Sequence, residues 1–204
     1  MRDVRNPMAP NKFLIITATA LAYFLFDRVN VMLFEELKFS YSVHWVYLPS
    51  GLRMALILVF LTNGAIGVAL ASMLVKYLLP SFDGDYWALA VTGLIMGLAP
   101  LWARRIAVDW LKLDPALTNL SAVKLFQLSV LFAVIPPVVE QLWFVYSKMT
   151  QDFLMSTAVM IAGDWVGIVF FLCLLKLMLP VLRSSGLLGS KSNSSNYLKT
   201  SAHV

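Results

Sequence analysis

The chain has 204 residues, of which 60% are hydrophobic and only 13% are charged, with a net charge of +5 and a mean hydropathy of +0.78. The charged share is about half that of an ordinary globular domain, which excludes a water-soluble fold and predicts an all-α, polytopic helix bundle in a membrane. A single cysteine, Cys173, excludes an internal disulfide framework, and we expect neither a metal site nor a cofactor. The basic excess is typical of cytoplasmic anchoring, so we expect a lipid bilayer and no nucleic acid as partner.

The N-terminal residues 1–12 are basic and contain two prolines, which predicts a short cytoplasmic lead before a membrane domain over residues 13–182. The apolar run that follows lacks the cleavage pattern of a signal peptide. We interpret residues 13–32 as a retained first span, with Asp27 and Arg28 close to its far interface.

The sequence Pro49-Ser50-Gly51 forbids a continuous helix and favours a turn or a broken helix. Residues 52–79 are then either one long tilted span or two short helices joined at residues 62–64. We favour two helices, because Asn-Gly is a poor helix interior and 28 residues exceed a usual span. The break at Pro49–Gly51 must be buried in protein or face water.

A fourth span is predicted over residues 86–102, where Gly93 and Gly97 form a small-residue face suited to close helix packing. The next ten residues, 103–112, have one apolar face and several charges. They form either an amphipathic helix on the membrane surface or a continuation of the span, and the pattern leaves both open.

Residues 123–145 form the fifth predicted span, which Pro136-Pro137 should break or kink because each proline removes a backbone donor. Glu140 follows within one turn and is an acid at membrane depth. Residues 153–179 form the sixth span.

Six spans with both termini in the cytoplasm place ten Lys and Arg residues on the inside and four on the outside. This bias supports a multi-pass protein of the inner (plasma) membrane with that orientation. Residues 183–204 are rich in Ser, Gly and Asn, which predicts a disordered cytoplasmic tail.

Asp164 is the only acid in the sixth span, and an acid near mid-membrane costs about 2.5–3.5 kcal/mol on insertion scales. Gly163 and Gly167 lie four residues apart, so a neighbouring helix can approach closely beside it. Asp164 either ties two helices together or has a ligand or signalling role. We expect Arg53 to pair with Asp164 or Glu140 near the break after Pro49.

No catalytic motif is present. His44 and His203 are the only histidines, and we find no nucleophile with a matching base, no zinc-protease motif and no phosphate loop. We therefore expect no enzyme activity.

Three stretches resemble the membrane-associated sensor domain, MASE, type one. They are Pro49-Ser50-Gly51-Leu52 with the turn at Gly64 and the run Ala69-Leu70-Ala71-Ser72, the double arginine Arg104-Arg105, and Gly163-Asp164-Trp165-Val166-Gly167. The resemblance covers residues 45–180. It implies an integral membrane sensory module of a family usually fused to a histidine kinase or a diguanylate cyclase. The tail of about two dozen residues is too short for such a domain, so we expect either partner to act in trans. The family positions that carry over are Pro49, Ser50, Gly51, Gly163, Asp164 and Gly167.

The first functional hypothesis is therefore a stand-alone sensory membrane domain that detects a small ligand or a membrane signal. A homodimer is compatible with it. A small solute transporter, or a substrate-binding transporter subunit, is the first alternative, because broken helices and buried charges also occur there. A structural membrane subunit is the second.

Overall fold

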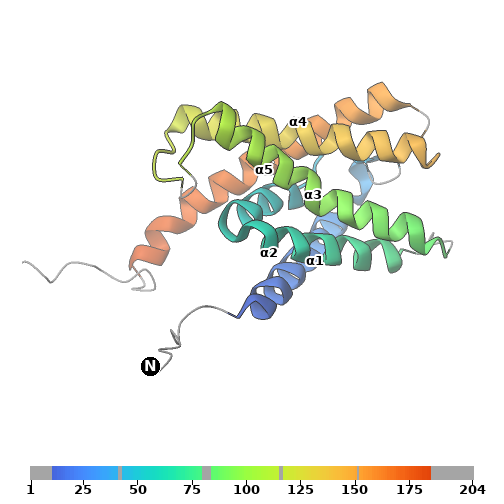
Figure 1. Cartoon of the computed structure of the whole chain (residues 1–204), viewed down its shortest axis with the longest axis horizontal. Coiled ribbons are helices and arrows are strands. Elements are labelled where there is room, and N and C mark those ends of the chain that lie inside the picture. The colour runs from blue at the N-terminus through green and yellow to red at the C-terminus, as the bar shows by residue number, and fades with distance from the viewer. Residues whose placement is uncertain (1–10, 41–42, 80–83, 115–116, 151, 185–204) are drawn as a thin grey trace, which may run out of the picture. The chain divides into compact units, whose positions relative to one another are not determined.

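The computed structural model describes residues 11–40, 43–79, 84–114, 117–150 and 152–184 (Figure 1). The expected lead before Asn11 and the expected tail from residue 185 onward lie outside these ranges. The described helices are α1 (Lys12–Phe34), α2 (Pro49–Tyr77), α3 (Tyr86–Trp110), α4 (Ala122–Tyr146) and α5 (Phe153–Ser184). A 3-10 turn, η1 (Glu35–Leu37), and an antiparallel pair of short strands, β1 (Lys38–Ser40) and β2 (Val43–His44), connect α1 to α2.

The chain divides into two compact units, Met1–Phe171 and Leu172–Val204. In the second unit, residues 172–184 are the last part of α5. All contacts described below belong to the first unit.

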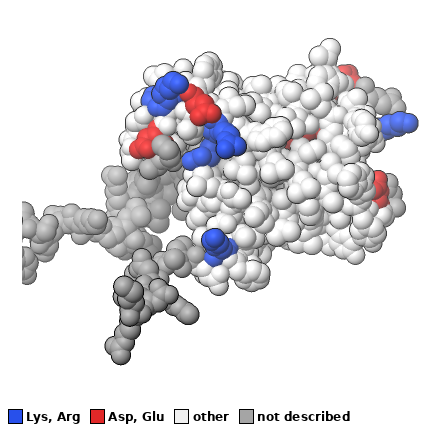
Figure 2. Space-filling view, viewed as in Figure 1, with Lys and Arg blue, Asp and Glu red and all other residues white. Residues whose placement is uncertain are grey.

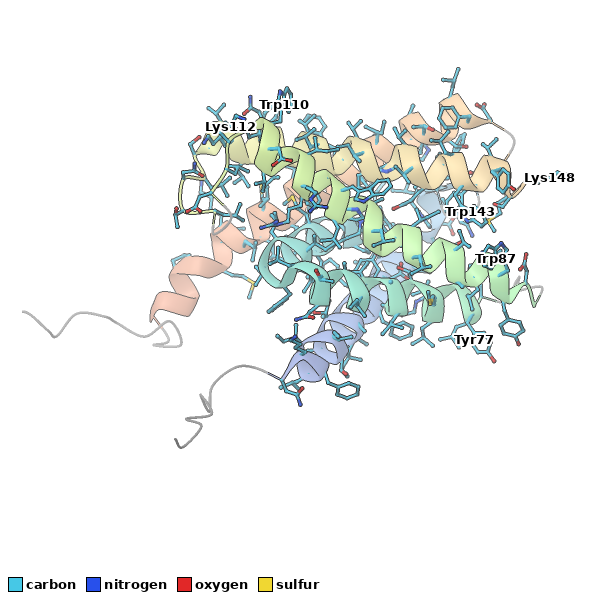
Figure 3. All side chains as sticks on the ribbon, viewed as in Figure 1. Tyr77, Trp87, Trp110, Lys112, Trp143 and Lys148 are labelled. Atoms are coloured by element: carbon cyan, nitrogen blue, oxygen red, sulfur yellow. The ribbon has the colours of Figure 1, made fainter. Side chains whose placement is uncertain are left out.

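Five helices of the described residues are long and apolar enough to cross a membrane, by length and composition, which agrees with the predicted all-α class. Charged side chains on the face drawn in Figure 2 gather toward the two ends of the first unit, and its middle is almost uncharged. Figure 3 shows Trp110 and Lys112 at one end, and Tyr77, Trp87 and Lys148 at the other. Aromatic side chains at both ends of apolar helices are typical of the two interfaces of a bilayer.

The second helix, α2, is sharply broken at Leu61, whose φ of 53° and ψ of −126° are not helical. A straight helix would hold residues eight apart at about 12 Å along its axis. A Cβ added at Gly64 would instead overlap the carbonyl oxygen of Leu56. The halves 49–60 and 62–77 therefore fold back on each other, as the two-helix interpretation predicted, with the break one residue before the expected turn.

Contacts between elements show that six segments alternate in direction: α1, the first half of α2, the second half of α2, α3, α4 and α5 (Figure 1). The pairs that set these directions are Asn30 with Leu48, Thr19 with Gly67, Gly93 with Met73, Gly97 with Ala65, Thr92 with Trp143, Lys112 with Lys124, Gln141 with Met160 and Phe126 with Trp165.

The predicted packing role of Gly93 and Gly97 is confirmed at the contact between α3 and the second half of α2. A Cβ added at Gly97 would lie 2.5 Å from the carbonyl oxygen of Ala65, and one at Gly93 would overlap Met73. The missing side chains let the two backbones approach closely, as small residues do in membrane helix pairs.

Two further predictions concerned whether a helix continues, one after residue 102 and the other through Pro136-Pro137. Residues 103–110 continue α3, with Ala103 and Ala107 buried four residues apart on one face. Of the break or kink expected at Pro136-Pro137, the break is wrong, since α4 is helical through both prolines. Both are buried, so packing holds the turn in place although two backbone hydrogen bonds are lost.

Candidate functional site

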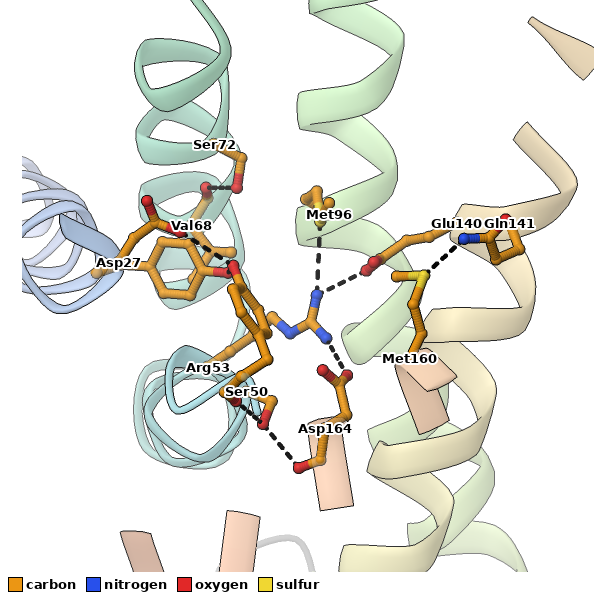
Figure 4. A network of polar contacts seen from close by, with 12 residues as sticks. Asp27, Ser50, Arg53, Val68, Ser72, Met96, Glu140, Gln141, Met160 and Asp164 are labelled. Carbon is orange, nitrogen blue, oxygen red and sulfur yellow. Dashed lines mark hydrogen bonds and ion pairs between the residues drawn. The ribbon is translucent and has the colours of Figure 1, made fainter. Parts of the chain in front are cut away.

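Three ionisable side chains from three helices meet in the interior, and we call them the ion cluster: Arg53 of α2, Glu140 of α4 and Asp164 of α5 (Figure 4). Arg53 Nη1 donates to Glu140 Oε1 at 2.6 Å, and Arg53 Nη2 donates to Asp164 Oδ2 at 2.7 Å. All three side chains are only 2–3% exposed. The predicted ion pairing of Arg53 is therefore confirmed, and it involves both acids because the planar guanidinium presents separate nitrogens to each.

The ion cluster joins three elements that are distant in sequence, since Glu140 and Asp164 lie 87 and 111 positions after Arg53. Its formal charge is −1. Buried ion pairs contribute little net stability, because desolvation offsets their attraction, but removing one partner costs about 3–5 kcal/mol. The ion cluster thus fixes how α2, α4 and α5 meet.

Pro49, Ser50 and Gly51 place Arg53 by docking the start of α2 on α5. Ser50 Oγ lies 2.8 Å from the carbonyl oxygens of both Tyr47 and Asp164. A Cβ at Gly51 would overlap Phe171. All three residues are buried, and neither cavity described below is lined by them. Their direct contacts are thus structural.

Gly163 and Gly167 make close contacts, as predicted, and Gly167 meets the first turn of α2 at Ser50 and Gly51. A Cβ added at Gly163 would overlap the carbonyl oxygen of His44, and one at Gly167 would overlap that of Tyr47. Tyr47 N also donates to Gly163 O at 3.2 Å. The two glycines therefore let the chain between His44 and the first turn of α2 pack closely against α5.

The buried face of α1 is polar, which the sequence interpretation missed. Asp27 is 5% exposed and is therefore buried among other side chains of the protein. Its carboxylate forms an ion pair with Arg28 at 2.5 Å and accepts a hydrogen bond from the Tyr47 hydroxyl at 3.3 Å. The Tyr47 hydroxyl in turn lies 3.0 Å from the Tyr23 hydroxyl. The sequence does contain a signal for this polar face, because polar residues recur there every three or four positions, as on one side of a helix. These residues are the buried ones of α1, namely Thr19, Tyr23, Asp27 and Asn30.

A cavity of about 390 Å³ lies between α1, the strand pair, the second half of α2 and α3, and we call it the vestibule. Its size falls within the range of small-molecule sites. Both charge signs are present in its lining, with an excess of basic side chains. The polar and charged lining residues most relevant here are Asp27, Lys38, His44, Tyr47, Lys76 and Thr92.

A second, smaller cavity of about 20 Å³, which we call the inner cavity, touches the ion cluster. Glu140 and Asp164 line it, together with Met160. Its other three lining residues, His44, Tyr47 and Met96, also line the vestibule. One layer of side chains therefore separates the vestibule from the two acids.

The half-buried His44 lies in this layer, and its ring stacks on Tyr47 with centroids 5.9 Å apart. Its Nδ1 atom is buried and has no hydrogen-bond partner in the part of the chain that the structure describes. Burial lowers the pKa of the imidazole below its ordinary value of 6.5, and the nearby Lys38 lowers it further, against opposing effects of Asp27 and Glu35. His44 is thus kept neutral near pH 7, with one ring nitrogen able to donate and the other to accept.

Scans of the chain against protein-family models, curated proteins and solved structures return no match.

Proposed function

We propose that this chain is an integral membrane sensory domain that binds a small ligand in the vestibule and signals through a separate protein. The observation that carries this proposal is the shared wall of His44, Tyr47 and Met96. A ligand in the vestibule would touch the same side chains that bound the inner cavity and its two acids. Buried ionisable residues in membrane helices are the default candidates for function.

The proposed orientation puts the Trp110 end of the first unit in the cytoplasm, because basic residues gather there. Lys112 lies at that end (Figure 3), Lys124 bonds to its carbonyl, and Arg104 and Arg105 belong to the last two turns of α3. Six alternating segments are compatible with both termini in the cytoplasm. Glu35, Lys38 and Lys76 line the vestibule near the other end. The vestibule would then receive its signal from outside the cell.

Tyr47 is the proposed link between the vestibule and the helices. Its hydroxyl bonds to Asp27 of α1, its backbone N–H bonds to Gly163 of α5, and its carbonyl accepts from Ser50 of α2. A ligand that displaces the Tyr47 ring in one of two states would shift how these helices meet. Signalling requires this unequal binding to the two states.

The resemblance to the MASE type one family supports the same proposal, since Pro49–Gly51 and Gly163–Gly167 form one contact region around the ion cluster. The partner proposed from that resemblance is a histidine kinase or a diguanylate cyclase.

The test is native mass spectrometry of the protein purified gently from its host membrane. A small molecule bound to the wild type, lost in Ser72→Trp and kept in Leu70→Trp, would support the vestibule as its site. Ser72 lines the vestibule, whereas Leu70 is exposed on the same helix. A co-purifying kinase or cyclase would identify the output. An ATPase module, or no partner and no ligand, would contradict the sensory proposal.

A transporter remains the second candidate, favoured by the broken α2. At 1.5 Å per residue, its first half of 12 residues extends about 18 Å, less than the roughly 30 Å of a bilayer core. Such half-helices with charges nearby are common at transporter binding sites. Solute uptake into vesicles that contain the purified chain would favour this function.

A further inference from the structure

The ion cluster holds more negative than positive charge, and this imbalance calls for a neutralising group. Glu140 and Asp164 each bond to Arg53, and in the described residues no other cation bonds to either acid. Met96 Sδ, at 3.6 Å from Arg53 Nη1, adds no charge. An uncompensated charge in an apolar interior is costly, and taking up one proton removes it.

The inner cavity offers a place from which such a proton can arrive. Its volume of about 20 Å³ has room for one water molecule, which needs roughly 10–15 Å³ and two to four polar partners. Glu140, Asp164, Tyr47 and His44 supply polar atoms around it. His44, which lines this cavity, has a buried Nδ1 without a hydrogen-bond partner among the described residues.

His44 also connects this cavity to the vestibule, since it lines both. A neutral imidazole accepts a proton at one nitrogen and releases one from the other, so it can relay protons through a wall that water cannot cross. The charged groups acting on His44 are Lys38 of β1, Asp27 of α1 and Glu35 of η1. Those on the inner side are the acids of α4 and α5, with Arg53 of α2 behind them.

We propose that Glu140 and Asp164 share one exchangeable proton, which enters from the vestibule through His44 and a water in the inner cavity. A hydronium ion in the vestibule protonates one nitrogen of His44, and the other nitrogen releases its proton to the inner water. That water passes a proton to a carboxylate oxygen, so one O–H bond forms at the acids for each one broken in the vestibule. The charge of the ion cluster rises from −1 to 0.

Protonation would weaken one of the two ion pairs of Arg53 and so loosen either α4 or α5 from α2. The bound species is a proton, and the inference holds whether or not the vestibule binds a further ligand. Its test therefore fails or succeeds independently of the ligand test above.

The experiment is infrared difference spectroscopy of the full chain in lipid nanodiscs, between about pH 8 and about pH 6, where an ordinary carboxyl stays ionised. The wild type should gain a protonated-carboxyl band, and Asp164→Asn and Glu140→Gln should each lose it. Asp109→Asn, which removes an exposed acid of α3, should keep it. A wild type without this band, or a band unchanged in both single variants, would overturn the shared proton. The wild-type measurement does not require either variant to fold.

The route is tested by the rate at which the same band shifts after transfer to D₂O. His44→Phe keeps a ring to stack on Tyr47 but cannot relay protons, so its exchange should be slower than in the wild type. Exchange as fast as in the wild type would exclude His44 from the route.

Discussion

Replacing Arg53 by methionine removes the only cation that bonds to the two buried acids within the described residues. Methionine roughly keeps the length of the side chain and its apolar stem. The change therefore isolates the charge, and the result should be a large loss of stability rather than a local repacking.

The magnitude follows from the fate of Glu140 and Asp164, which are only 3% exposed as side chains. A buried carboxyl without a partner becomes neutral, and protonating it at pH 7 costs about 4 kcal/mol, because a carboxyl in water titrates near pH 4 and each pH unit is worth about 1.4 kcal/mol. This value agrees with the roughly 3–5 kcal/mol measured when buried ion pairs are broken. Both acids lose a partner, so about 4 kcal/mol is a lower limit. The deficit should shrink as the pH falls toward 4, where protonation costs nothing.

The assay is thermal unfolding in mild detergent, followed by size-exclusion fluorescence, at about pH 7 and about pH 5. Arg105→Met, which removes an exposed arginine of α3, is the matched control and should stay close to the wild type. The triple variant Arg53→Met/Glu140→Gln/Asp164→Asn should recover most of the loss, because no charge of the ion cluster is then left buried. An Arg53→Met protein as stable as the control, or a triple variant no better than the single one, would refute the ion cluster.

Three further predictions concern single positions. Gly167→Ala should destabilise the fold, because the Cβ of the alanine would overlap the carbonyl oxygen of Tyr47. This loss should exceed the roughly 1 kcal/mol by which alanine is favoured over glycine in a helix. A melting temperature at or above that of the wild type would contradict this contact. The lowered pKa of His44 means that the unfolded chain binds a proton more readily, so stability should fall as the pH drops below about 6.5. A denaturation series across that pH should show a flatter curve for His44→Phe than for the wild type, and parallel curves would rule the effect out. Leu61→Gly should raise the melting temperature, because a positive φ of 53° strains leucine by about 1–3 kcal/mol and does not strain glycine. A melting temperature below that of the wild type would argue against the break at this residue.

Several features follow from the sequence because their causes are local. Apolar runs of suitable length predicted the helices, and the Asn-Gly pair beside Leu61 predicted that α2 would be two helices. The pairing of Arg53 was also predictable, because buried charges in apolar segments are usually paired with charges of opposite sign. The spacing of Gly93 and Gly97 indicated a packing face for the same kind of reason.

Tertiary structure alone decided which groups share the site. The sequence did not indicate that Asp27 would be buried, or that its carboxylate would bond to Tyr47, twenty positions away. Gly163 and Gly167 gave no sign that they would pack against the backbone at His44 and Tyr47, more than a hundred residues earlier. Periodicity reports which face of a helix is buried, but it carries no information about what covers that face. The site between His44, Glu140 and Asp164 depends on such long-range contacts, and so it became visible only in the folded chain.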